Sequence, residues 1–580
     1  METLHNRIDL VRIPFTDRGS RLLFHQKEHR FFIRLAERWV KWEKEVGHYR
    51  RRPPIITDLT YLSPSGEPLT EVTTDTYPHV ANIDTPVGRF SWVFIDPETM
   101  MMRLPVGEFG LEFNVYAQDA GTDYRGGVMH GKRNVAYTTN ARLKANICEQ
   151  VDADHFHVKL QLHADPGDVL LLNITPRLAY NRSLPDPENA IKTARNAWQA
   201  WFAATPPVLD EYRAQYDYAW WVMRSGIVNT RYYFTREALL PSKIHYVGVW
   251  HWDQAFHALA YRHVDVRLAE DQIRIVLDHQ RADGMLPDAI HDEGLVTHLD
   301  LPVAADVTKP PILSWAVMKV YEISRHEDFL AEVYEPLTRW NQWWLRDNRN
   351  GNGLCEYRHP FSSGLDDSPL WDSGMPVVSP DLNTYLVLQH ENLSEIAEIL
   401  GETEAAAVHR SNADTMAQNM IAKMWDEKAG VFRAIHKDRP ISTLTPFNLL
   451  PLLTGRLPES MVERVIANLT DPNLFWTEYP LPTVAVSDPA FDPEQMWRGP
   501  TWLNVNYFFV EALKRIGKHE LAAELRRKTL ELVMKHADIY EYYNPLNADH
   551  PPKAAPMFGW SCAIFIELAL DETWWRKYSE

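Results

Sequence analysis

Residues 380–401 read PDLNTYLVLQHENLSEIAEILG, and this stretch decides how the second half of the chain is interpreted. Its apolar residues recur at helical spacing and share one face. They are Leu382, Tyr385, Leu386, Leu393, Ile396 and Leu400. Pro380 and Asp381 begin the segment and Gly401 ends it, as helix-terminus chemistry predicts. The sequence therefore predicts a helix over residues 380–400.

Helical spacing dominates the chain from residue 206 onward. The other helices are predicted at residues 206–235, 253–263, 265–282, 309–325, 327–347, 403–426, 443–454, 458–469, 500–516, 518–536 and 555–570. Together with 380–400 they make twelve, and twelve helices in pairs would close into a double ring, an (α/α)6 barrel. The sequence has no visible short repeat, which disfavours a solenoid.

The first part of the chain is predicted to be β-structure. Residues 155–163 alternate apolar and polar side chains at every step, which is the period of a half-buried strand. A turn at 166–168 leads into a second strand at 169–174, and residues 89–95 and 111–117 look similar. Many short strands with turns between them favour an antiparallel sandwich. Residues 28–46 are the exception and are interpreted as a helix or a long irregular segment.

These patterns predict a mainly α chain with two domains. An antiparallel β-sandwich covers residues 1–184, a linker helix covers 185–205, and the (α/α)6 barrel covers 206–580. A chain of 580 residues is long enough for at least two domains.

Composition narrows the class of protein. The chain has 45% hydrophobic and 24% charged residues, as ordinary globular proteins do. Its formal net charge of −18 argues against nucleic acid as a partner, because phosphates require a basic surface. Three widely spaced cysteines predict neither a disulfide framework nor a zinc site. There is no signal-peptide pattern and no apolar run of membrane-spanning length, so a cytoplasmic protein without a membrane partner is expected.

Two acidic clusters stand among aromatic and turn-forming residues. The first is Ser363-Gly364-Leu365-Asp366-Asp367-Ser368-Pro369, and the second is Tyr540-Glu541-Tyr542-Tyr543-Asn544-Pro545. Two carboxylates brought together by folding and walled by Trp and Tyr are the minimal equipment for breaking a glycosidic bond. The 21 tryptophans suit the same interpretation, because the C–H face of a sugar stacks on an indole, although most of them must be core.

Each candidate residue also has a plain structural interpretation. The Asp366-Asp367 pair could be a solvated turn, and Glu541 could make a structural hydrogen bond. Asp253, in Trp250-His251-Trp252-Asp253, could cap the helix that begins there. His251 and His257 lie six residues apart, on different sides of a helix, and have no apparent third ligand, so no metal site is predicted.

Other reaction classes lack their sequence signatures. The chain has no Walker loop, no dinucleotide-binding glycine fingerprint after a strand and no Gly-x-Ser-x-Gly elbow. Phosphoryl transfer, hydride transfer and serine hydrolysis therefore lose support, and no cofactor is expected.

Several motifs together resemble glycoside hydrolase family 63, which includes the processing α-glucosidases. The first acidic cluster resembles that family's Ser-Gly-Leu-Asp-Asp-Tyr-Pro segment. Similar matches occur at Trp250-His251-Trp252-Asp253, Trp497-Arg498-Gly499-Pro500-Thr501-Trp502, Glu541-Tyr542-Tyr543-Asn544-Pro545 and Phe558-Gly559-Trp560. The same layout is similar to bacterial glucosylglycerate and mannosylglycerate hydrolases and, more remotely, to trehalases. The matches run in the expected order from Trp250 to Trp560 and cover nearly all of the helical region.

The resemblance implies an (α/α)6 barrel and an inverting α-glycosidase. Matched by position, Asp366 would be the general acid and Glu541 the general base. The residues implied to bind the sugar are Trp250, Trp252, Asp253, Lys309, Trp315, Arg498, Trp502 and Trp560. Two departures concern the substrate: Ser368-Pro369-Leu370 stands where the family often has Tyr-Pro-Arg, and Lys309 stands where glutamine is expected.

Lys309 has three interpretations. Its ammonium could bind an anionic group on the aglycone or pair with a pocket carboxylate such as Asp253. The plain alternative is a surface lysine at the start of a helix.

We therefore expect an exo-acting α-glycosidase, most simply an α-glucosidase that hydrolyses a small oligosaccharide or glucoside. The alternatives are another (α/α)6 activity, such as a debranching or glucoamylase-like hydrolase, and a carbohydrate-binding protein that has lost catalysis. Retention of both Asp366 and Glu541 weighs against the last, because binding alone needs neither.

Overall fold

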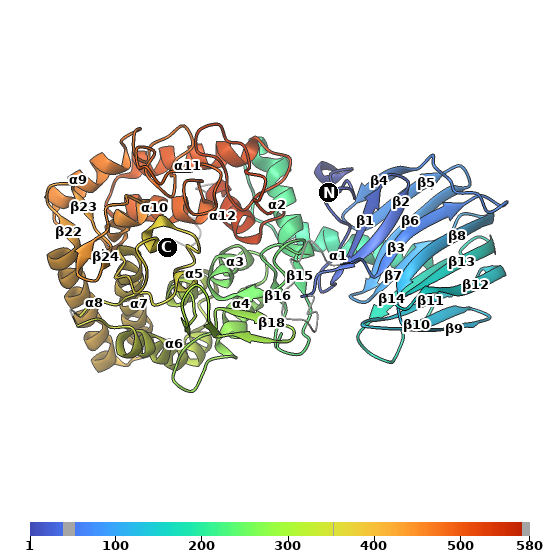
Figure 1. The fold of residues 1–580 in the computed structure, drawn as a ribbon, viewed down its shortest axis with the longest axis horizontal. Helices are drawn as coiled ribbons and strands as arrows, with labels where there is room; N and C mark the ends of the chain where they lie inside the picture. The colour runs from blue at the N-terminus through green and yellow to red at the C-terminus, as the bar shows by residue number, and fades with distance from the viewer. Residues whose placement is uncertain (39–52, 352, 571–580) are drawn as a thin grey trace. The chain divides into compact units, whose positions relative to one another are not determined.

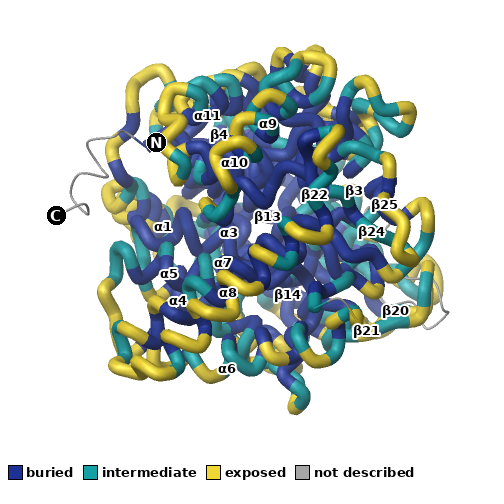
Figure 2. The backbone as a smooth tube through the Cα atoms, turned by 90° about the vertical axis from the view of Figure 1, so that its left-hand side faces the viewer, coloured by how far each residue is buried: buried dark blue, intermediate teal, exposed yellow. Residues whose placement is uncertain are grey.

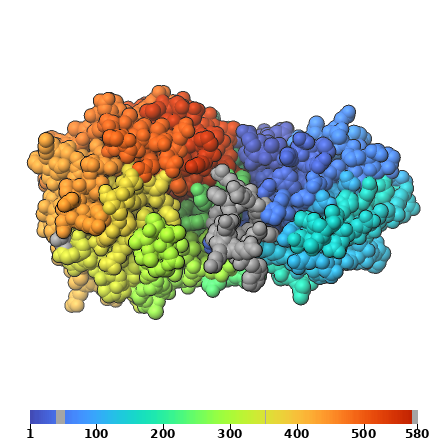
Figure 3. Space-filling view, viewed as in Figure 1, coloured from blue at the N-terminus to red at the C-terminus, as the bar shows by residue number. Residues whose placement is uncertain are grey.

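The computed structural model describes residues 1–38, 53–351 and 353–570, and its chain forms two compact units. The first contains Met1–Thr205, Arg224–Asn229 and Lys243–Val247, and the second contains Pro206–Met223, Thr230–Ser242 and the chain from Gly248 onward. Figures 1 and 3 colour the chain by residue number, so the first unit runs from blue to teal and the second mainly from green to red. The domain boundaries expected from the sequence remain a prediction.

The first unit is built on two antiparallel sheets. The strands of the six-stranded sheet are, in spatial order, β1 (Leu22–Lys27), β2 (Arg30–Leu35), β3 (Ile56–Leu62), β8 (Gly107–Tyr116), β13 (His155–Ala164) and β12 (Arg142–Asp152). Those of the eight-stranded sheet are β4 (Thr73–Tyr77), β5 (Val80–Thr85), β6 (Gly88–Asp96), β7 (Thr99–Arg103), β14 (Val169–Thr175), β11 (Asn134–Thr139), β10 (Gly126–His130) and β9 (Asp119–Asp123). The prediction of an N-terminal antiparallel β-domain is confirmed.

Aromatic side chains join the two sheets. Tyr61 on β3 packs 4.2 Å from Phe90 on β6, and its hydroxyl accepts a hydrogen bond of 2.8 Å from the Trp92 indole. Strand β13 alternates between buried and partly exposed side chains along its whole length, as its sequence predicts. Helix α1 (Pro187–Ala203) follows the sheets and begins at Asp186, whose carboxylate caps the backbone N–H of Asn189.

The second unit is a ring of helices. In chain order they are α2 (Arg213–Ser225), α3 (His251–Tyr261), α4 (Val266–Leu277), α5 (Leu313–Ser324), α6 (Glu327–Asp347), α7 (Pro380–Ile399), α8 (Thr403–Met424), α9 (Glu459–Leu469), α10 (Leu503–Arg515), α11 (His519–Met534) and α12 (Gly559–Ala569). The six positions of an inner ring, among the described residues, are α3, α5, α7, the 3-10 segment η7 (Leu450–Thr454), α10 and α12, each in contact with the next, and α12 closes back on α3. Figure 2 draws buried segments such as α3 in dark blue.

The remaining described elements are short and are distributed over both units. The strands are β15 (Ile227–Val228), β16 (Ala238–Leu239), β17 (Val249–Trp250), β18 (Ala289–His291), β19 (Gly294–Val296), β20 (His298–Leu299), β21 (Ala305–Asp306), β22 (Trp425–Asp426), β23 (Val431–Phe432), β24 (Ile435–His436) and β25 (Arg439–Pro440). The other 3-10 turns are η1 (Glu2–Leu4), η3 (Asp210–Tyr212), η4 (Pro360–Ser363), η5 (Pro369–Trp371) and η6 (Pro446–Asn448).

Three expectations about secondary structure need correction. The helix predicted at 443–454 is instead η6 and η7, because Pro446 and Pro451 each remove a backbone donor and Gly455 turns the chain with φ 65°. Within 28–46 the chain forms strand β2 rather than a helix or an irregular segment, and residues 39–46 lie outside the described part. The chain is a mixture of β and α structure, so the prediction of a mainly α protein is not confirmed.

Candidate active site

The acidic and aromatic residues singled out in the sequence lie at one end of the helical ring. Trp252 and Asp253 are in the first turn of α3, Trp502 directly precedes α10, and Trp560 is the second residue of α12. The loops that carry Asp366 and Glu541 precede inner helices in the same way. The N-terminal ends of these inner helices therefore carry the candidate site.

The Asp366 loop is held tightly against Trp252. Gly364 has φ 72° and ends η4, and a Cβ added to it would fall 2.3 Å from the Trp252 ring. Only glycine fits this approach without strain. The neighbouring carboxylate of Asp367 accepts hydrogen bonds from Gln495 Nε2 at 2.6 Å and from the backbone N–H of Trp497 at 2.8 Å. Asp367 thus anchors the loop, and this leaves Asp366 for another purpose.

The Asp366 carboxyl is partly open and chemically unusual. Its side chain is 36% exposed, but Oδ1 is buried and has no hydrogen-bond partner among the described residues. Burial raises the pKa of Asp366 to about 6, a rise that the nearby charge of Lys309 opposes and those of Asp288 and Asp367 support. A carboxyl with this pKa can hold a proton close to neutral pH and donate it to a bound ligand.

A buried lysine lies beside this carboxyl. Lys309 Nζ is 2.8 Å from Asp288 Oδ1 and 3.9 Å from Asp366 Oδ1, and it donates a hydrogen bond of 2.6 Å to the carbonyl oxygen of Phe361. Lys309 is 3% exposed, so it is not a surface lysine. Its ion-pair partner is Asp288 rather than the Asp253 considered from the sequence.

Glu541 is fixed by the backbone across from it. Its N–H donates to the carbonyl oxygen of Ala555 at 2.9 Å, and its Oε2 accepts from the N–H of Ala555 at 3.1 Å. Tyr543 pairs with Thr501 through two backbone hydrogen bonds, which ties the Glu541 loop to the segment before α10. The side chain of Glu541 is buried, and Tyr542 packs against Trp502 with ring centres 4.9 Å apart.

The charges of Lys309 and Glu541 both act on the buried carboxyl of Asp253. The N-cap of α3 is Trp250, without a side-chain cap, so Asp253 stands inside the first turn rather than at the cap. Burial raises the pKa of Asp253 well above its usual value, Lys309 opposes this rise, and the charge of Glu541 adds to it. The pKa of Asp253 therefore depends on both Lys309 and Glu541.

Four tryptophans form a continuous wall. Trp497 stacks on Trp502 with ring centres 3.7 Å apart, Trp560 contacts Trp502 at 5.5 Å, and Trp252 contacts Trp560 at 5.2 Å. Trp315, in the first turn of α5, contacts Phe256, Tyr507 and Phe508.

Trp250 and Arg498, also predicted to bind the sugar, contact neighbouring segments of the chain. Trp250 contacts His291 on the neighbouring strand β18. Arg498 makes a two-point ion pair with Asp372 and donates to the Asp367 carbonyl oxygen, so its guanidinium braces the acidic loop.

The sequence analysis missed Asp288, Gln495 and Trp497. Asp288 follows Pro287 in a short loop and carries no motif, and its importance comes from meeting Lys309. Trp497 stood inside a recognised motif but was not chosen as a site residue. The hydrogen bond from Gln495 to Asp367 spans 128 residues, so no local pattern signals it.

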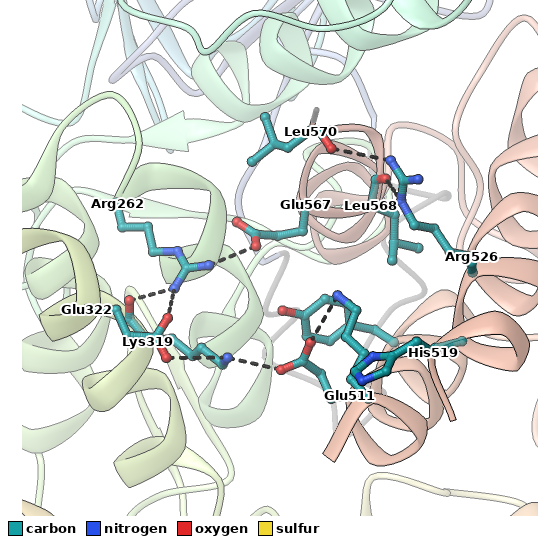
Figure 4. A pocket seen from close by; sticks show the side chains of 13 residues that line it. Arg262, Lys319, Glu322, Glu511, His519, Arg526, Glu567, Leu568 and Leu570 are labelled. Carbon is teal, nitrogen blue, oxygen red and sulfur yellow. Dashed lines mark hydrogen bonds and ion pairs between the residues drawn. The ribbon is translucent and has the colours of Figure 1, made fainter. Parts of the chain in front are cut away.

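The opposite, C-terminal ends of the inner helices enclose a different charged cluster around a cavity of about 350 Å³. Arg262 pairs with Glu567 at 2.8 Å and with Glu322 at 3.2 Å, and Lys319 pairs with Glu511 at 3.0 Å (Figure 4). None of the sequence-based candidates lines this cavity. Its acids are paired with cations, unlike the partly open Asp366.

The described residues contain neither a cluster of metal-ligand side chains nor a membrane-spanning helix. Within residues 1–38, 53–351 and 353–570, His, Cys, Asp and Glu form no group of three or more that could hold a metal ion. Across the same ranges no helix is both long and apolar enough to cross a membrane.

Fold and sequence comparisons define the class of protein. A family model described as the mannosylglycerate hydrolase MGH1-like glycoside hydrolase domain matches residues 246–561, which include helices α3 to α11 and both acidic loops. The protein is a glycoside hydrolase. It belongs to this MGH1-like family within glycoside hydrolase family 63.

Individual relatives agree with this placement. A mannosylglycerate hydrolase of Thermus thermophilus is 26% identical over 58% of this chain and 97% of its own length, and mannosylglycerate hydrolase MGH1 of Selaginella moellendorffii is 25% identical over 56% and 81%. A crystal structure of a family 63 mannosylglycerate hydrolase from Thermus thermophilus in complex with glucose covers 58% of this chain and 96% of its own, with 24% identity and a TM-score of 0.50. A bacterial glucoamylase complexed with acarbose shares the fold over 98% of this chain and 97% of its own, with 11% identity and a TM-score of 0.59.

Proposed function

We propose that this chain is an inverting, exo-acting α-glycosidase in which Asp366 is the general acid and Glu541 the general base. The catalytic domain is an (α/α)6 barrel formed by residues 206–580. Such an enzyme needs one carboxyl that carries a proton to the leaving oxygen and one carboxylate that activates water on the opposite face of the sugar.

The state of Asp366 carries this proposal. Burial raises the pKa of its carboxyl to about 6, and its buried Oδ1 has no hydrogen-bond partner among the described residues. Its neighbour Asp367 is fully engaged by Gln495 and Trp497, so Asp366 is the better candidate of the adjacent pair. General acid–base catalysis works best when the pKa of the acid lies near the working pH.

Glu541 is assigned as the base by its position in the family motif and by its fixed backbone. Asp253 is assigned to bind sugar hydroxyls, together with the tryptophan wall, Lys309 and Arg498. In a closed, liganded enzyme we expect the carboxyl groups of Asp366 and Glu541 about 6.5–9.5 Å apart, which leaves room for the attacking water.

The substrate class is a small α-glycoside. An α-glucoside or a small oligosaccharide is our first candidate. A second candidate is α-mannosylglycerate, because the matching family model and the Thermus thermophilus relative carry that name. A debranching or glucoamylase-like activity would instead require long glucans to be the better substrates.

A substrate panel tests the proposal. The purified protein is incubated with mannosylglycerate, glucosylglycerate, maltose and maltoheptaose, and NMR follows the first anomer released. Inversion predicts the β-anomer from each α-linked substrate that is cleaved, and release slowed by about 10²–10⁴-fold in Asp366→Asn and Glu541→Gln. First release of the α-anomer would mean a covalent intermediate and would refute the assigned mechanism, while no release by the wild type from any substrate would refute the function.

A further inference from the structure

The ammonium of Lys309 is shared between three segments of the chain. It lies 2.8 Å from Asp288 Oδ1, donates to the Phe361 carbonyl oxygen at 2.6 Å, and lies 3.9 Å from Asp366 Oδ1. A lysine ammonium has three N–H groups and no acceptor. Contacts with Asp288 and the Phe361 carbonyl oxygen use two of these N–H groups. Asp366 lies within ion-pair range of the ammonium but beyond the distance of a direct hydrogen bond.

The backbone next to Lys309 is tied to the same two segments. The N–H of Thr308 donates to Ser362 Oγ at 3.3 Å, and its hydroxyl donates to the Leu286 carbonyl oxygen at 2.8 Å. Ser362 lies four residues before Asp366 and Leu286 two before Asp288. The lysine is therefore held in register with both carboxylates, so its distance to Asp366 is set by the fold.

Charges of both signs near Lys309 act on Asp366. The cation lowers the pKa of Asp366, and Asp288 and Asp367 raise it. Burial would lower the pKa of Lys309 itself, but Asp288, Asp366 and Asp253 outweigh burial and keep the amine charged. The other titratable groups that face it do not compete as cations: burial lowers the pKa of His251 on α3 to about 3, and burial also lowers that of His359, the N-cap of η4.

We propose that Lys309 and Asp288 are a positioning pair that sets when the Asp366 carboxyl holds its proton. Asp288 offsets enough of the ammonium charge for Asp366 to remain protonated until a substrate is bound. When the proton passes from Asp366 Oδ to the glycosidic oxygen, the new carboxylate lies beside the ammonium, which stabilises it. The catalytic consequence rests on the proposed role of Asp366 as general acid.

A simple structural brace would behave differently. Removal of either partner of a brace would lower stability and activity together and leave the titration of Asp366 in place. A positioning pair predicts that the two partners move the pKa of Asp366 in opposite directions, because one is a cation and the other an anion.

The test titrates Asp366 directly and needs no substrate. Infrared difference spectroscopy follows the protonated carboxyl band that is absent in Asp366→Asn. Asp288→Asn should lower the pKa of Asp366 by roughly 1–3 units, and Lys309→Gln should raise it by a comparable amount. The double variant should fall between them, and Lys309→Arg, which keeps the charge, should stay near the wild type and shows that position 309 tolerates replacement. Shifts in the same direction, or no shift, in the two single variants would overturn the proposal.

Kinetics separate this inference from the proposed function. For any substrate that is cleaved, the pKa of the alkaline limb of the kcat/KM pH profile should shift by the same amount and in the same direction as the pKa that the infrared band of Asp366 reports. One outcome is that the infrared band of Asp366 shifts as expected while the alkaline limb of kcat/KM does not follow, or while no substrate is cleaved. In either case the pair controls the proton of Asp366, and the assignment of Asp366 as the general acid fails. If neither band nor limb shifts while hydrolysis proceeds, the positioning role fails alone.

Discussion

Both ends of the helical ring bury carboxylates, but the pKa values of the two clusters are shifted in opposite directions. At the N-terminal ends of the inner helices, burial raises the pKa of Asp366, Asp288 and Asp253. At the C-terminal ends, burial would have the same effect on Glu511 and Glu567, but neighbouring cations outweigh it and lower the pKa of both. Burial alone therefore does not decide whether a carboxyl is protonated.

The supply of cations makes the difference. The C-terminal cluster gives its acids three cations, Arg262, Lys319 and Lys514. The N-terminal carboxylates Asp366, Asp288 and Asp253 share Lys309. Helix dipoles would act the other way, since they favour anions at N-termini, but they contribute only about 0.3–1 kcal/mol each. Desolvation is the larger effect, so the N-terminal end keeps acids that can carry protons and the C-terminal end keeps a structural ion-pair network.

The largest expected effect is the loss of catalysis on removal of the tuned acid. Asp366→Asn should lower turnover by about 10²–10⁴-fold on substrates with poor leaving groups, because the leaving oxygen no longer receives a proton. The loss should shrink for an activated aryl glycoside, which needs no proton. Steady-state kinetics on both substrate types checks this, with Asp372→Asn, which loosens the Arg498 brace, as the matched carboxylate-to-amide control. Near-normal turnover of a natural disaccharide by Asp366→Asn would refute the assignment.

A carboxylate removed from the other end should cost stability instead. Glu567 pairs with Arg262, and both side chains are 1% exposed. Glu567→Gln leaves that guanidinium buried without its carboxylate, and breaking such a pair typically costs about 3–5 kcal/mol. Calorimetry should show a clear fall in Tm. Glu322→Gln is the matched control, because Glu322 is 46% exposed and should matter little. Equal small effects of both changes would mean that the buried network is not structural.

Asp366→Asn, which also replaces a carboxyl group by an amide, should raise the stability of the folded protein. Burial raises its pKa from the usual 3.8 to about 6, so the folded state holds this proton more tightly than the unfolded state does. Its contribution to stability is then largest below pH 3.8, declines as the pH rises to about 6, and is constant above. Asp366→Asn removes this decline, so its Tm should exceed that of the wild type above pH 6, and the difference should vanish near pH 4. A lower Tm for Asp366→Asn than for the wild type at pH 8 would contradict the idea that the ionised Asp366 carboxylate destabilises the folded protein.

The smallest effect belongs to the rim of the C-terminal cluster. Lys514 is 54% exposed and lies 3.9 Å from Glu511. Exposed pairs contribute only about 0–1 kcal/mol, so Lys514→Gln should change Tm little and leave kcat unchanged. Scans at low and high salt serve as the measurement, and any small loss should disappear at high salt. A loss as large as that of Glu567→Gln would mean that Lys514 belongs to the buried network.

Regular periodicity was the most reliable guide to the fold. Helix α7 and strand β13 occupy nearly the residues that their patterns predict, because a stripe of apolar side chains at one fixed period can be buried by one element only. The stretch at 443–454 failed because apolar content suggested a helix while its two prolines broke the hydrogen-bond ladder. The prediction for residues 30–35 was wrong because their strand is stabilised by pairing with β1 and β3, which a local sequence pattern does not reveal.

For the site, sequence motifs located the two acidic loops and the tryptophans that precede the inner helices. They did not show which tryptophans touch: Trp497 and Trp502 stack closely, while Trp315 packs elsewhere in the ring. They also missed Asp288, because a single aspartate in a loop has no pattern of its own.

The sequence by itself determined the class of elements, the order of the motifs and the family to which they belong. Within the adjacent pair, only the family resemblance favoured Asp366, since Asp366 and Asp367 are chemically identical neighbours. Tertiary structure gave the two carboxylates different surroundings, because Gln495 and the backbone of Trp497, about 130 residues away, bind Asp367, while Asp366 lies near Lys309. The pKa of a carboxyl depends on burial and on charges within a few ångströms, and those neighbours exist only once the chain has folded.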